Sequence, residues 1–319
     1  MNRWGRVVRA AVSVLLIGWL ATGGSAQADP AAYTPADGVE SMYFQAGPSE
    51  VTEEIGFGCC DSTGAEYDIW YPSDLGATRH PIVVWGNGTD AVPSQYGHLL
   101  RHLASWGFVV IATENRQTGS GVDILSSLTY LLDRAQDPSS AFFGKLDPTA
   151  VGALGHSQGA NGVLNAMIKS AGAIKTVIPF ELPARIWCSG TCADTRSLSS
   201  GSLFLVNGSA DTFISPSDQL RPWESSGLQS NRAYYEAATV PKAWGTLNGL
   251  NHNDIQGQPD CARASFSCTT GVYGYLGYPT AWLLAELRGD TTARSIFVTG
   301  TGPFLASSPN WSNQTSTVH

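Results

Sequence analysis

Short apolar runs alternate with amphipathic segments from residue 80 to about residue 290. Continuous runs of four to eight apolar residues are typical of buried strands, and apolar side chains that recur every three or four residues are typical of helices. The runs that predict strands are 81–85, 108–112, 151–155, 174–179 and 203–207, and the segments that predict helices are 95–106, 122–135, 159–170 and 275–288. This alternation predicts an α/β fold with a mostly parallel central sheet and helices on both faces.

The two ends of this pattern are less regular. Residues 51–57 and 66–71 predict a hairpin before the first buried run, and residues 232–239 predict a last strand. After residue 288 the chain becomes rich in Gly, Ser, Thr and Pro, and residues 307–319 are predicted to be a flexible tail. No internal repeat or linker divides the chain, so we expect a single domain.

The first 28 residues have the pattern of a secretory signal. Three arginines precede an apolar run at 10–21, and Ala26-Gln27-Ala28 supplies the small residues that a signal peptidase reads. The run is shorter than the ~20 apolar residues that a membrane span requires, and no other stretch approaches that length. We therefore expect an exported protein that begins at Asp29 and has no membrane span.

Charge and cysteine content limit which partners the protein can bind and indicate the compartment in which it works. Without the signal, 15 basic and 26 acidic residues remain, and a net charge of −11 disfavours nucleic acid as a partner. Six cysteines in an exported chain favour disulfides over a metal site. The pairing of the adjacent residues Cys59 and Cys60 stays open. The pairs predicted from their closeness in sequence are Cys188–Cys192 and Cys261–Cys268.

The segment Gly155-His156-Ser157-Gln158-Gly159 matches the pattern G-x-S-x-G and lies between a predicted strand and a predicted helix. In that setting a sharp turn holds the serine Oγ above the edge of the sheet. Both glycines are needed because a Cβ there would collide with the neighbouring strand and helix. Ser157 is therefore the candidate nucleophile, and we expect His156 to shape the turn rather than to titrate in catalysis.

A serine nucleophile needs a base and an acid, and in this arrangement they follow the serine in the order acid, then histidine. Only His252 and His319 follow Ser157, and His319 lies in the predicted tail. His252 is therefore the candidate base. Asp211 follows the predicted strand 203–207 and is the candidate acid, which would orient the imidazole and stabilise its protonated form. The competing acids are Asp194, Asp218 and Asp254.

The oxyanion that forms in such a reaction needs preorganised N–H donors. The residue after the nucleophile normally supplies one donor, here the backbone of Gln158. The turn after strand 81–85 supplies the other, with Gly88 as first choice and Asn87 as second. No spacing of His, Cys, Asp or Glu suggests a catalytic metal, and no cofactor is implied.

With these residues in place, the chain from about residue 80 to residue 303 resembles the cutinase-like polyester hydrolases. These are the PETase-type branch of the α/β hydrolases, related to the dienelactone hydrolases. The resemblance implies that residues 29–306 form one α/β-hydrolase catalytic domain. It also implies that Ser157, Asp211 and His252 form the triad and that Gly88 and Gln158 bind the oxyanion. The motifs that carry it are 83–84 before the Gly-rich turn, 106–110, 155–159, 211–216 and 248–252.

The chain departs from that family in the expected substrate cleft. Gly88 stands where the family has an aromatic residue, Gln158 where it has methionine, and Pro183 where it has a mobile tryptophan. Losing two aromatic walls is expected to widen the cleft and to weaken stacking by about 0.5–1.5 kcal/mol per contact. Trp187 and Phe213 are expected to compensate in part. The residues predicted to bind substrate are Asn87, His156, Pro183, Trp187 and Phe213.

The sequence thus predicts a secreted serine esterase that works through an acyl-enzyme on Ser157. Its expected substrates are small or polymeric carboxylic esters with short or medium acyl chains, including polyesters such as PET. The alternatives are a lipase, a carbohydrate esterase that removes acetyl or feruloyl groups, and a non-catalytic binding protein with the same fold. We expect the protein to be a monomer.

Overall fold

The computed structural model describes residues 33–35, 38–218 and 227–319, so the predicted signal at residues 1–28 lies outside the described residues. Nine strands belong to one sheet within this part of the chain. They are β1 (Val51–Cys59), β2 (Glu66–Pro72), β3 (His80–Gly86), β4 (Val109–Thr113), β5 (Leu146–His156), β6 (Ile174–Phe180), β7 (Ser202–Gly208), β8 (Lys242–Leu247) and β9 (Trp311–Ser316).

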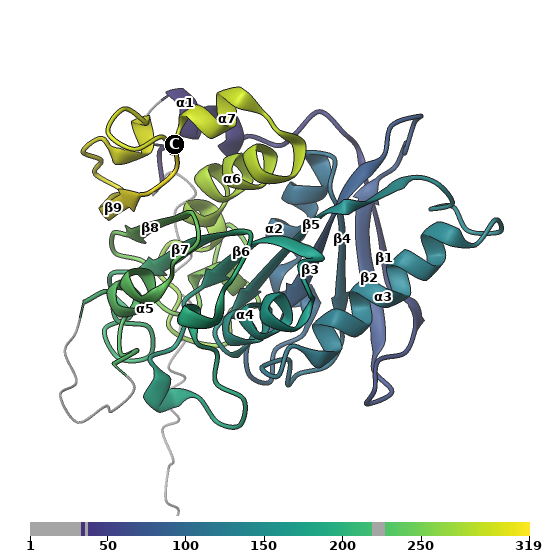
Figure 1. Cartoon of the computed structure of the whole chain (residues 1–319), viewed down its shortest axis with the longest axis horizontal. Helices are drawn as coiled ribbons and strands as arrows, with labels where there is room; N and C mark the ends of the chain where they lie inside the picture. The colour runs from purple at the N-terminus through teal and green to yellow at the C-terminus, as the bar shows by residue number, and fades with distance from the viewer. Residues whose placement is uncertain (1–32, 36–37, 219–226) are drawn as a thin grey trace, which may run out of the picture.

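The sheet is parallel in its centre and antiparallel at its margins (Figure 1). Its spatial order is β1-β2-β4-β3-β5-β6-β7-β8-β9. Strands β4, β3, β5, β6, β7 and β8 run parallel to their neighbours in this series. Strands β1, β2 and β9 pair in the antiparallel sense. The predicted α/β fold with a mostly parallel sheet is therefore confirmed.

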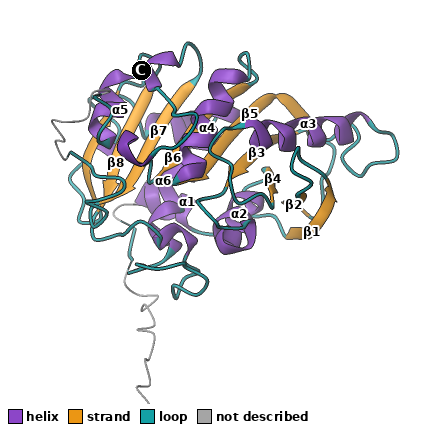
Figure 2. Cartoon of the chain, turned by 90° about the horizontal axis from the view of Figure 1, so that it is seen from below, coloured by secondary structure: helices purple, strands orange, loops and turns teal. Residues whose placement is uncertain are grey.

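Helices cover both faces of the sheet (Figure 2). One face carries α3 (Val122–Gln136), α4 (Gln158–Lys169) and α5 (Asn231–Ala237). The other face carries α1 (Gly38–Phe44), α2 (Gly97–Ser105) and α6 (Gly277–Arg288), and the short α7 (Thr291–Ser295) follows α6. Each face buries its own apolar cluster, with Trp85 and Trp282 on the α6 side and Ile124 and Val163 on the α4 side. All residues of β3 and β4 are buried because both faces are covered, which explains their unbroken apolar runs.

The prediction of a last strand at 232–239 is wrong, because residues 231–237 form helix α5. Ser230 caps this helix by accepting a hydrogen bond from the Ala233 N–H, and the capped turn stabilises a helix over an extended chain. The strand that precedes the His252 loop is β8 instead, at 242–247.

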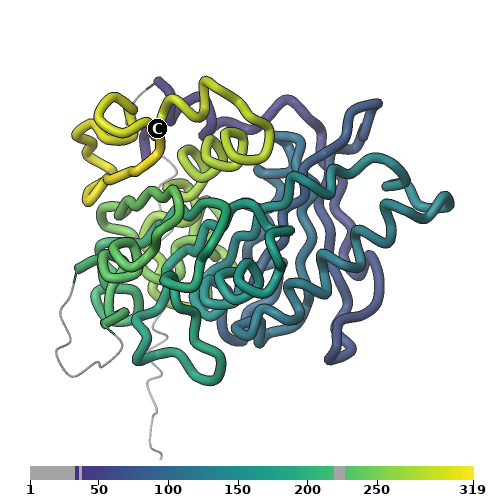
Figure 3. The backbone as a smooth tube through the Cα atoms, viewed as in Figure 1, coloured from purple at the N-terminus to yellow at the C-terminus, as the bar shows by residue number. Residues whose placement is uncertain are grey.

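The prediction of a flexible tail from Ser307 is also wrong, because residues 311–316 form β9 and pair with β8. Trp311 anchors this strand: its ring is buried, and its Nε1–H donates to Glu40 and to the hydroxyl of Tyr33. Figure 3 shows the result, with the N-terminal segment (purple) beside the C-terminal segment (yellow). Within the described ranges, no helix is both long and apolar enough to cross a bilayer.

Candidate active site

The loops after β3, β5, β7 and β8 meet at one edge of the sheet, because parallel strands all end on the same side. Ser157 follows β5, Asp211 follows β7 and His252 follows β8. Segments that are 41 to 95 residues apart in the sequence therefore bring their side chains into contact. This is where open α/β sheets place their binding crevices.

Ser157 sits in a turn that leaves no space for side chains on its glycine neighbours. Its backbone has φ 54° and ψ −119°, and its N–H donates to the carbonyl of Phe180 at 3.0 Å. A Cβ on Gly159 would lie 2.1 Å from the carbonyl oxygen of Gly86, and one on Gly155 would lie 2.5 Å from that of Gly159. Helix α4 begins at Gln158, so its first N–H groups, which have no partner within the helix, border the serine. The structure thus has the strand-turn-helix geometry predicted from the motif.

The three predicted triad side chains form a continuous hydrogen-bonded chain. Nε2 of His252 lies 2.9 Å from Oγ of Ser157, and its Nδ1 lies 2.6 Å from Oδ2 of Asp211. The three residues are only 9%, 5% and 4% exposed, respectively for Ser157, His252 and Asp211. Burial raises the pKa of Asp211, but the hydrogen bonds from His252 and from the N–H groups of Ile214 and Ser215 outweigh burial and hold the pKa below its ordinary value. Asp211 is therefore an anion beside the imidazole.

The competing acids do not reach the His252 ring as Asp211 does. Asp194 and Asp218 form surface ion pairs with Arg196 and Arg232. Asp254 accepts its hydrogen bonds from a neighbouring loop.

His156 supports the histidine loop from inside the protein. Its Nε2–H donates to the carbonyl of His252 at 2.8 Å, which leaves Nδ1 to accept a hydrogen bond from the Tyr96 hydroxyl at 3.0 Å. Burial, and then the nearby His252, hold the pKa of His156 well below its ordinary value. His156 is therefore a neutral, fixed part of the turn, as its position before the nucleophile predicts.

The turn after β3 is predicted to offer the Gly88 N–H to the oxyanion, but in the structure this N–H already has a partner. The Gly88 N–H donates to the Tyr96 hydroxyl at 3.0 Å and is not available to an oxyanion in this arrangement. Asn87 is fully buried, and its amide donates to the carbonyls of Thr113 and Asn115 instead of facing the site. Thr89, which follows, lines the cleft, and so does Gln158.

A cleft of about 740 Å³ opens over Ser157 and His252. Trp187 and Phe213 form one wall, with ring centroids 4.6 Å apart and the Trp187 Nε1–H donating to the carbonyl of Phe213. Phe266 also lines the cleft. All three rings are about half exposed or more. The predicted substrate residues His156, Pro183, Trp187 and Phe213 line this cleft, and the lining also includes Gln117, Asn161, Ile214 and Gln256.

Comparison with known proteins identifies the family of the chain. Residues 25–245 match the PETase family, which is described as PET hydrolase-like. The chain belongs to this family. It is also 29% identical over 298 residues to a bis(hydroxyethyl) terephthalate hydrolase of Streptomyces coelicolor, covering 91% of this chain and 84% of that protein. The protein is therefore a carboxylic ester hydrolase, as the sequence predicts.

One PETase-type feature is excluded by packing at Gly88. A Cβ at this position would lie 2.7 Å from Nδ1 of His156 and 3.0 Å from the Tyr96 hydroxyl oxygen. The surrounding side chains therefore leave no room at this position for the aromatic residue that the family has there, in agreement with the glycine in this chain. The rings that line this cleft are Trp187, directly before the Cys188–Cys192 loop, Phe213 in the loop after β7, and Phe266 inside the Cys261–Cys268 loop.

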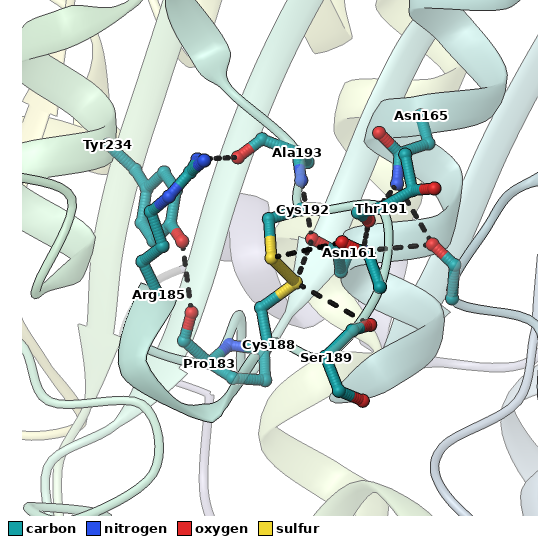
Figure 4. Close-up of a disulfide and its surroundings, with 12 residues drawn as sticks. Asn161, Asn165, Pro183, Arg185, Cys188, Ser189, Thr191, Cys192, Ala193 and Tyr234 are labelled. Carbon is teal, nitrogen blue, oxygen red and sulfur yellow. Dashed lines mark hydrogen bonds between the residues drawn. A yellow bond between two sulfur atoms is a disulfide. The ribbon is translucent and has the colours of Figure 1, made fainter. Parts of the chain in front are cut away.

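The first of these loops contains the predicted Cys188–Cys192 disulfide and is held by helix α4 (Figure 4). The side-chain amides of Asn161 and Asn165 both donate to the carbonyl of Thr191, at 2.9 and 2.8 Å. Oδ1 of Asn161 accepts a hydrogen bond from the Ala193 N–H. The sequence analysis missed both asparagines, although their i, i+4 spacing on the helix after the nucleophile would place them on one face.

The second loop contains the predicted Cys261–Cys268 disulfide and carries Phe266. In this loop the carbonyl of Arg263 accepts a hydrogen bond from the side-chain amide of Gln95 at 2.9 Å. The remaining two cysteines, Cys59 and Cys60, are paired with each other in the structure.

Asp254 joins this second loop to the loop that carries His252. Its Oδ2 accepts from the Asn251 N–H at 2.7 Å, and its Oδ1 accepts from the N–H groups of Thr269 and Gly271 at 2.9 and 2.7 Å. The carboxylate is fully buried, so its partners have no water to replace it. Asp254 is therefore not placed to act as the catalytic acid. It holds the loop of His252 against the loop that carries Phe266.

The clusters that resemble metal sites have other bonding partners. Asp254 lies near the sulfur atoms of Cys261 and Cys268, but those two sulfur atoms are bonded to each other. Glu181, Asp211 and His252 also lie together, where Nδ1 of His252 and both oxygens of Asp211 already have protein partners. In this second cluster a hydrogen bond joins His252 to Asp211, and Glu181 accepts a hydrogen bond from the hydroxyl of Tyr275.

Asp254→Asn is expected to weaken the attachment of the second loop to the loop that carries His252. An amide NH₂ in place of one oxygen would face backbone N–H groups, and a buried unsatisfied donor costs about 1–3 kcal/mol. We expect the free energy of unfolding in urea to fall by that amount and kcat for p-nitrophenyl butyrate to fall about tenfold. Asp260→Asn removes the same charge from the same segment and is expected to change neither quantity. Equal behaviour of the two variants would contradict this role for Asp254.

Proposed function

We propose that this PETase-family protein hydrolyses esters through a covalent acyl-enzyme on Ser157. The observation that carries the proposal is the continuous contact from Ser157 Oγ through the His252 ring to Asp211. In the first step Nε2 of His252 takes the proton of Oγ while Oγ attacks the ester carbonyl carbon. Asp211 keeps the ring in the required tautomer and stabilises the imidazolium that forms.

The tetrahedral intermediate needs donors for its oxyanion, and we propose the backbone N–H groups of Gln158 and Thr89. Gln158 is the first residue of α4, and both residues line the cleft. The intermediate then collapses, and the imidazolium gives its proton to the departing alcohol. Water, activated by the same imidazole, attacks the acyl-enzyme and regenerates Oγ–H. Each step uses groups of this chain and a water molecule.

Ser157→Ala is expected to abolish hydrolysis of p-nitrophenyl butyrate, with a loss in kcat on the order of 10⁴-fold or more. A fluorophosphonate probe is expected to label the wild-type protein at the peptide that contains residue 157, as mass spectrometry would show. Ser189→Ala changes another serine that lines the cleft and should retain both activity and labelling. Full activity of the Ser157→Ala variant, with an unchanged circular dichroism spectrum, would refute the mechanism.

We propose that the preferred substrates have an aromatic acyl group, as in terephthalate esters and polyesters such as PET. Three observations support this substrate class. The cleft is lined by three aromatic rings, those of Trp187, Phe213 and Phe266. The chain belongs to a family described as PET hydrolase-like, and a relative is named for a terephthalate ester. A lipase or a carbohydrate esterase that removes acetyl groups would have no specific need for these rings, whereas a feruloyl esterase also acts on an aromatic acyl group.

Removing a ring is expected to weaken binding of aromatic substrates selectively. For Trp187→Ala and for Phe266→Ala, we expect KM for bis(hydroxyethyl) terephthalate to rise about two- to tenfold, because each ring contact contributes about 0.5–1.5 kcal/mol. Values for p-nitrophenyl acetate should change less than twofold. Phe143→Ala removes an exposed ring outside the cleft and should affect neither substrate. Equal losses on both substrates, or losses on neither, would exclude a selective role.

We also propose that the protein is exported and that its mature chain begins at Asp29. The signal-like sequence before that residue supports export, and so do the Cys188–Cys192 and Cys261–Cys268 disulfides, because disulfides persist in oxidising compartments. Expression of the full chain in a bacterium with an intact secretion pathway should place the protein outside the cytoplasm. Edman sequencing is expected to read Asp29 first, and a product that stays in the cytoplasm with Met1 intact would reject the proposal.

A further inference from the structure

Glu181 is a fully buried acid directly beneath the triad, and the proposed mechanism does not use it. It follows β6 with φ +50°, in the left-handed region that side-chain-bearing residues rarely adopt. Its N–H donates to the carbonyl of Val206 at 2.9 Å, and the carbonyl of the preceding residue, Phe180, accepts the N–H of Ser157. The residue is therefore fixed between the strand that precedes the acid and the turn that carries the nucleophile. Backbone strain of this kind persists where surrounding contacts impose it, and it clusters at active sites.

The Glu181 carboxyl group lies against Asp211 and His252. One of its oxygens, one Asp211 oxygen and a ring nitrogen of His252 all lie within 4.8 Å of one another. Two carboxylates this close in a buried site cannot both ionise without a large cost, so one of them holds a proton.

Hydrogen bonding decides which of the two acids holds the proton. Asp211 accepts three N–H groups, from His252, Ile214 and Ser215. Glu181 accepts the hydroxyl of Tyr275 on Oε1 at 2.6 Å, and its Oε2 has no hydrogen-bond partner in the described part of the chain. Donors stabilise the ionised form of a carboxyl group, so the charge belongs on Asp211 and the proton on Glu181.

The other groups that face Glu181 agree with this assignment. Burial, and then the negative charge of Asp211, raise the pKa of Glu181 well above its ordinary value, against the lowering by the Tyr275 hydroxyl and the nearby Gly208 N–H. Asp254, in the short helix η5 (Asp254–Gln256), also raises it. Tyr275 ends the short helix η6 (Val272–Tyr275), and burial, and then Glu181, raise its pKa well above the ordinary value, so its hydroxyl is a neutral donor.

We propose that Glu181 is a positioning residue of the active site that acts as a neutral carboxylic acid. It leaves the negative charge on Asp211, and through Tyr275 it ties the end of β6 to the segment that follows the His252 loop. A second anion at this place would favour the imidazolium form of His252 and so remove the free base. The inference rests on the proposed roles of Asp211 and His252, but its first test measures folding and does not depend on catalysis.

The first test compares the unfolding equilibrium of wild type and Glu181→Gln in urea from pH 5 to pH 8. A folded-state pKa above the unfolded value means that wild type must release a proton on unfolding, so its stability declines as pH rises. The unfolding constant of wild type should therefore rise relative to the variant about tenfold per pH unit above the ordinary glutamate pKa of ~4.3, until the folded-state pKa is reached. The exposed control Glu236→Gln should keep a constant ratio across this range.

Two outcomes of that test would overturn the proposal. A constant ratio for Glu181→Gln would show that Glu181 is ionised in the folded protein. Failure of Glu181→Gln to fold, while wild type folds at the same pH, would also contradict it. A neutral carboxylic acid and a neutral amide have nearly the same size and charge, so the buried site should accept both. Glu181→Met, a second neutral side chain of similar length, should reproduce the pH trend.

The second test separates positioning from a purely structural role through kinetics on p-nitrophenyl butyrate. For Glu181→Gln we expect kcat within about twofold of wild type and an acid limb of the kcat/KM profile that superimposes on the wild-type limb. For Glu181→Ala and Tyr275→Phe, which break the link, kcat should fall several-fold with little change in KM. Tyr273→Phe, in the same short helix, is the matched control and should behave as wild type. A shift of the Glu181→Gln acid limb to lower pH would mean that a negative charge had been removed, and would refute the neutral acid.

Discussion

The approach of Gly159 to the carbonyl of Gly86 fixes the geometry on which the active site depends. Because that carbonyl lies where a Cβ of residue 159 would be, helix α4 starts directly against strand β3. The turn between β5 and α4 therefore has one available conformation, and it holds Ser157 in a strained backbone state with Oγ facing His252. The position of the nucleophile follows from packing among glycines and depends little on contacts of the serine side chain. Such preorganisation lowers the cost of reaching the reactive geometry.

The cleft walls belong to the same hydrogen-bond networks as the reacting groups. Asn161 attaches the first disulfide loop to the helix that starts after Ser157, and Asp254 attaches the second to the loop of His252. The buried acids near the base differ mainly in how many donors each accepts. Asp211 and Asp254 each accept several N–H groups, whereas Glu181 has only the Tyr275 hydroxyl and the nearby Gly208 N–H. Differences in local hydrogen bonding thus give chemically identical groups different charges and different roles.

Much of the fold followed from local patterns, and the exceptions have identifiable causes. Runs such as 81–85 are apolar throughout because both sheet faces are covered, and that signal survives in the sequence. The segment 231–237 is short and buries only Asn231 and Tyr234, so burial periodicity gave little guidance and the Ser230 cap decided its conformation. Strand β9 is mostly polar, and its pairing with β8 joins residues more than 60 positions apart. Polar edge strands of this kind have no local apolar signature.

By itself the sequence determined the α/β fold, the candidate nucleophile and the order of the candidate acid and base. These features rest on local spacing: a turn motif between a strand and a helix, a histidine that must follow, and an aspartate at the end of a buried run. Tertiary structure alone decided which N–H groups remain free, because the Tyr96 hydroxyl occupies that of Gly88. It also brought Phe266 into the cleft and Glu181 beside Asp211. The physical reason is that hydrogen-bond availability and burial at a given atom depend on side chains from distant segments, and the spacing of residues along the chain does not encode those contacts.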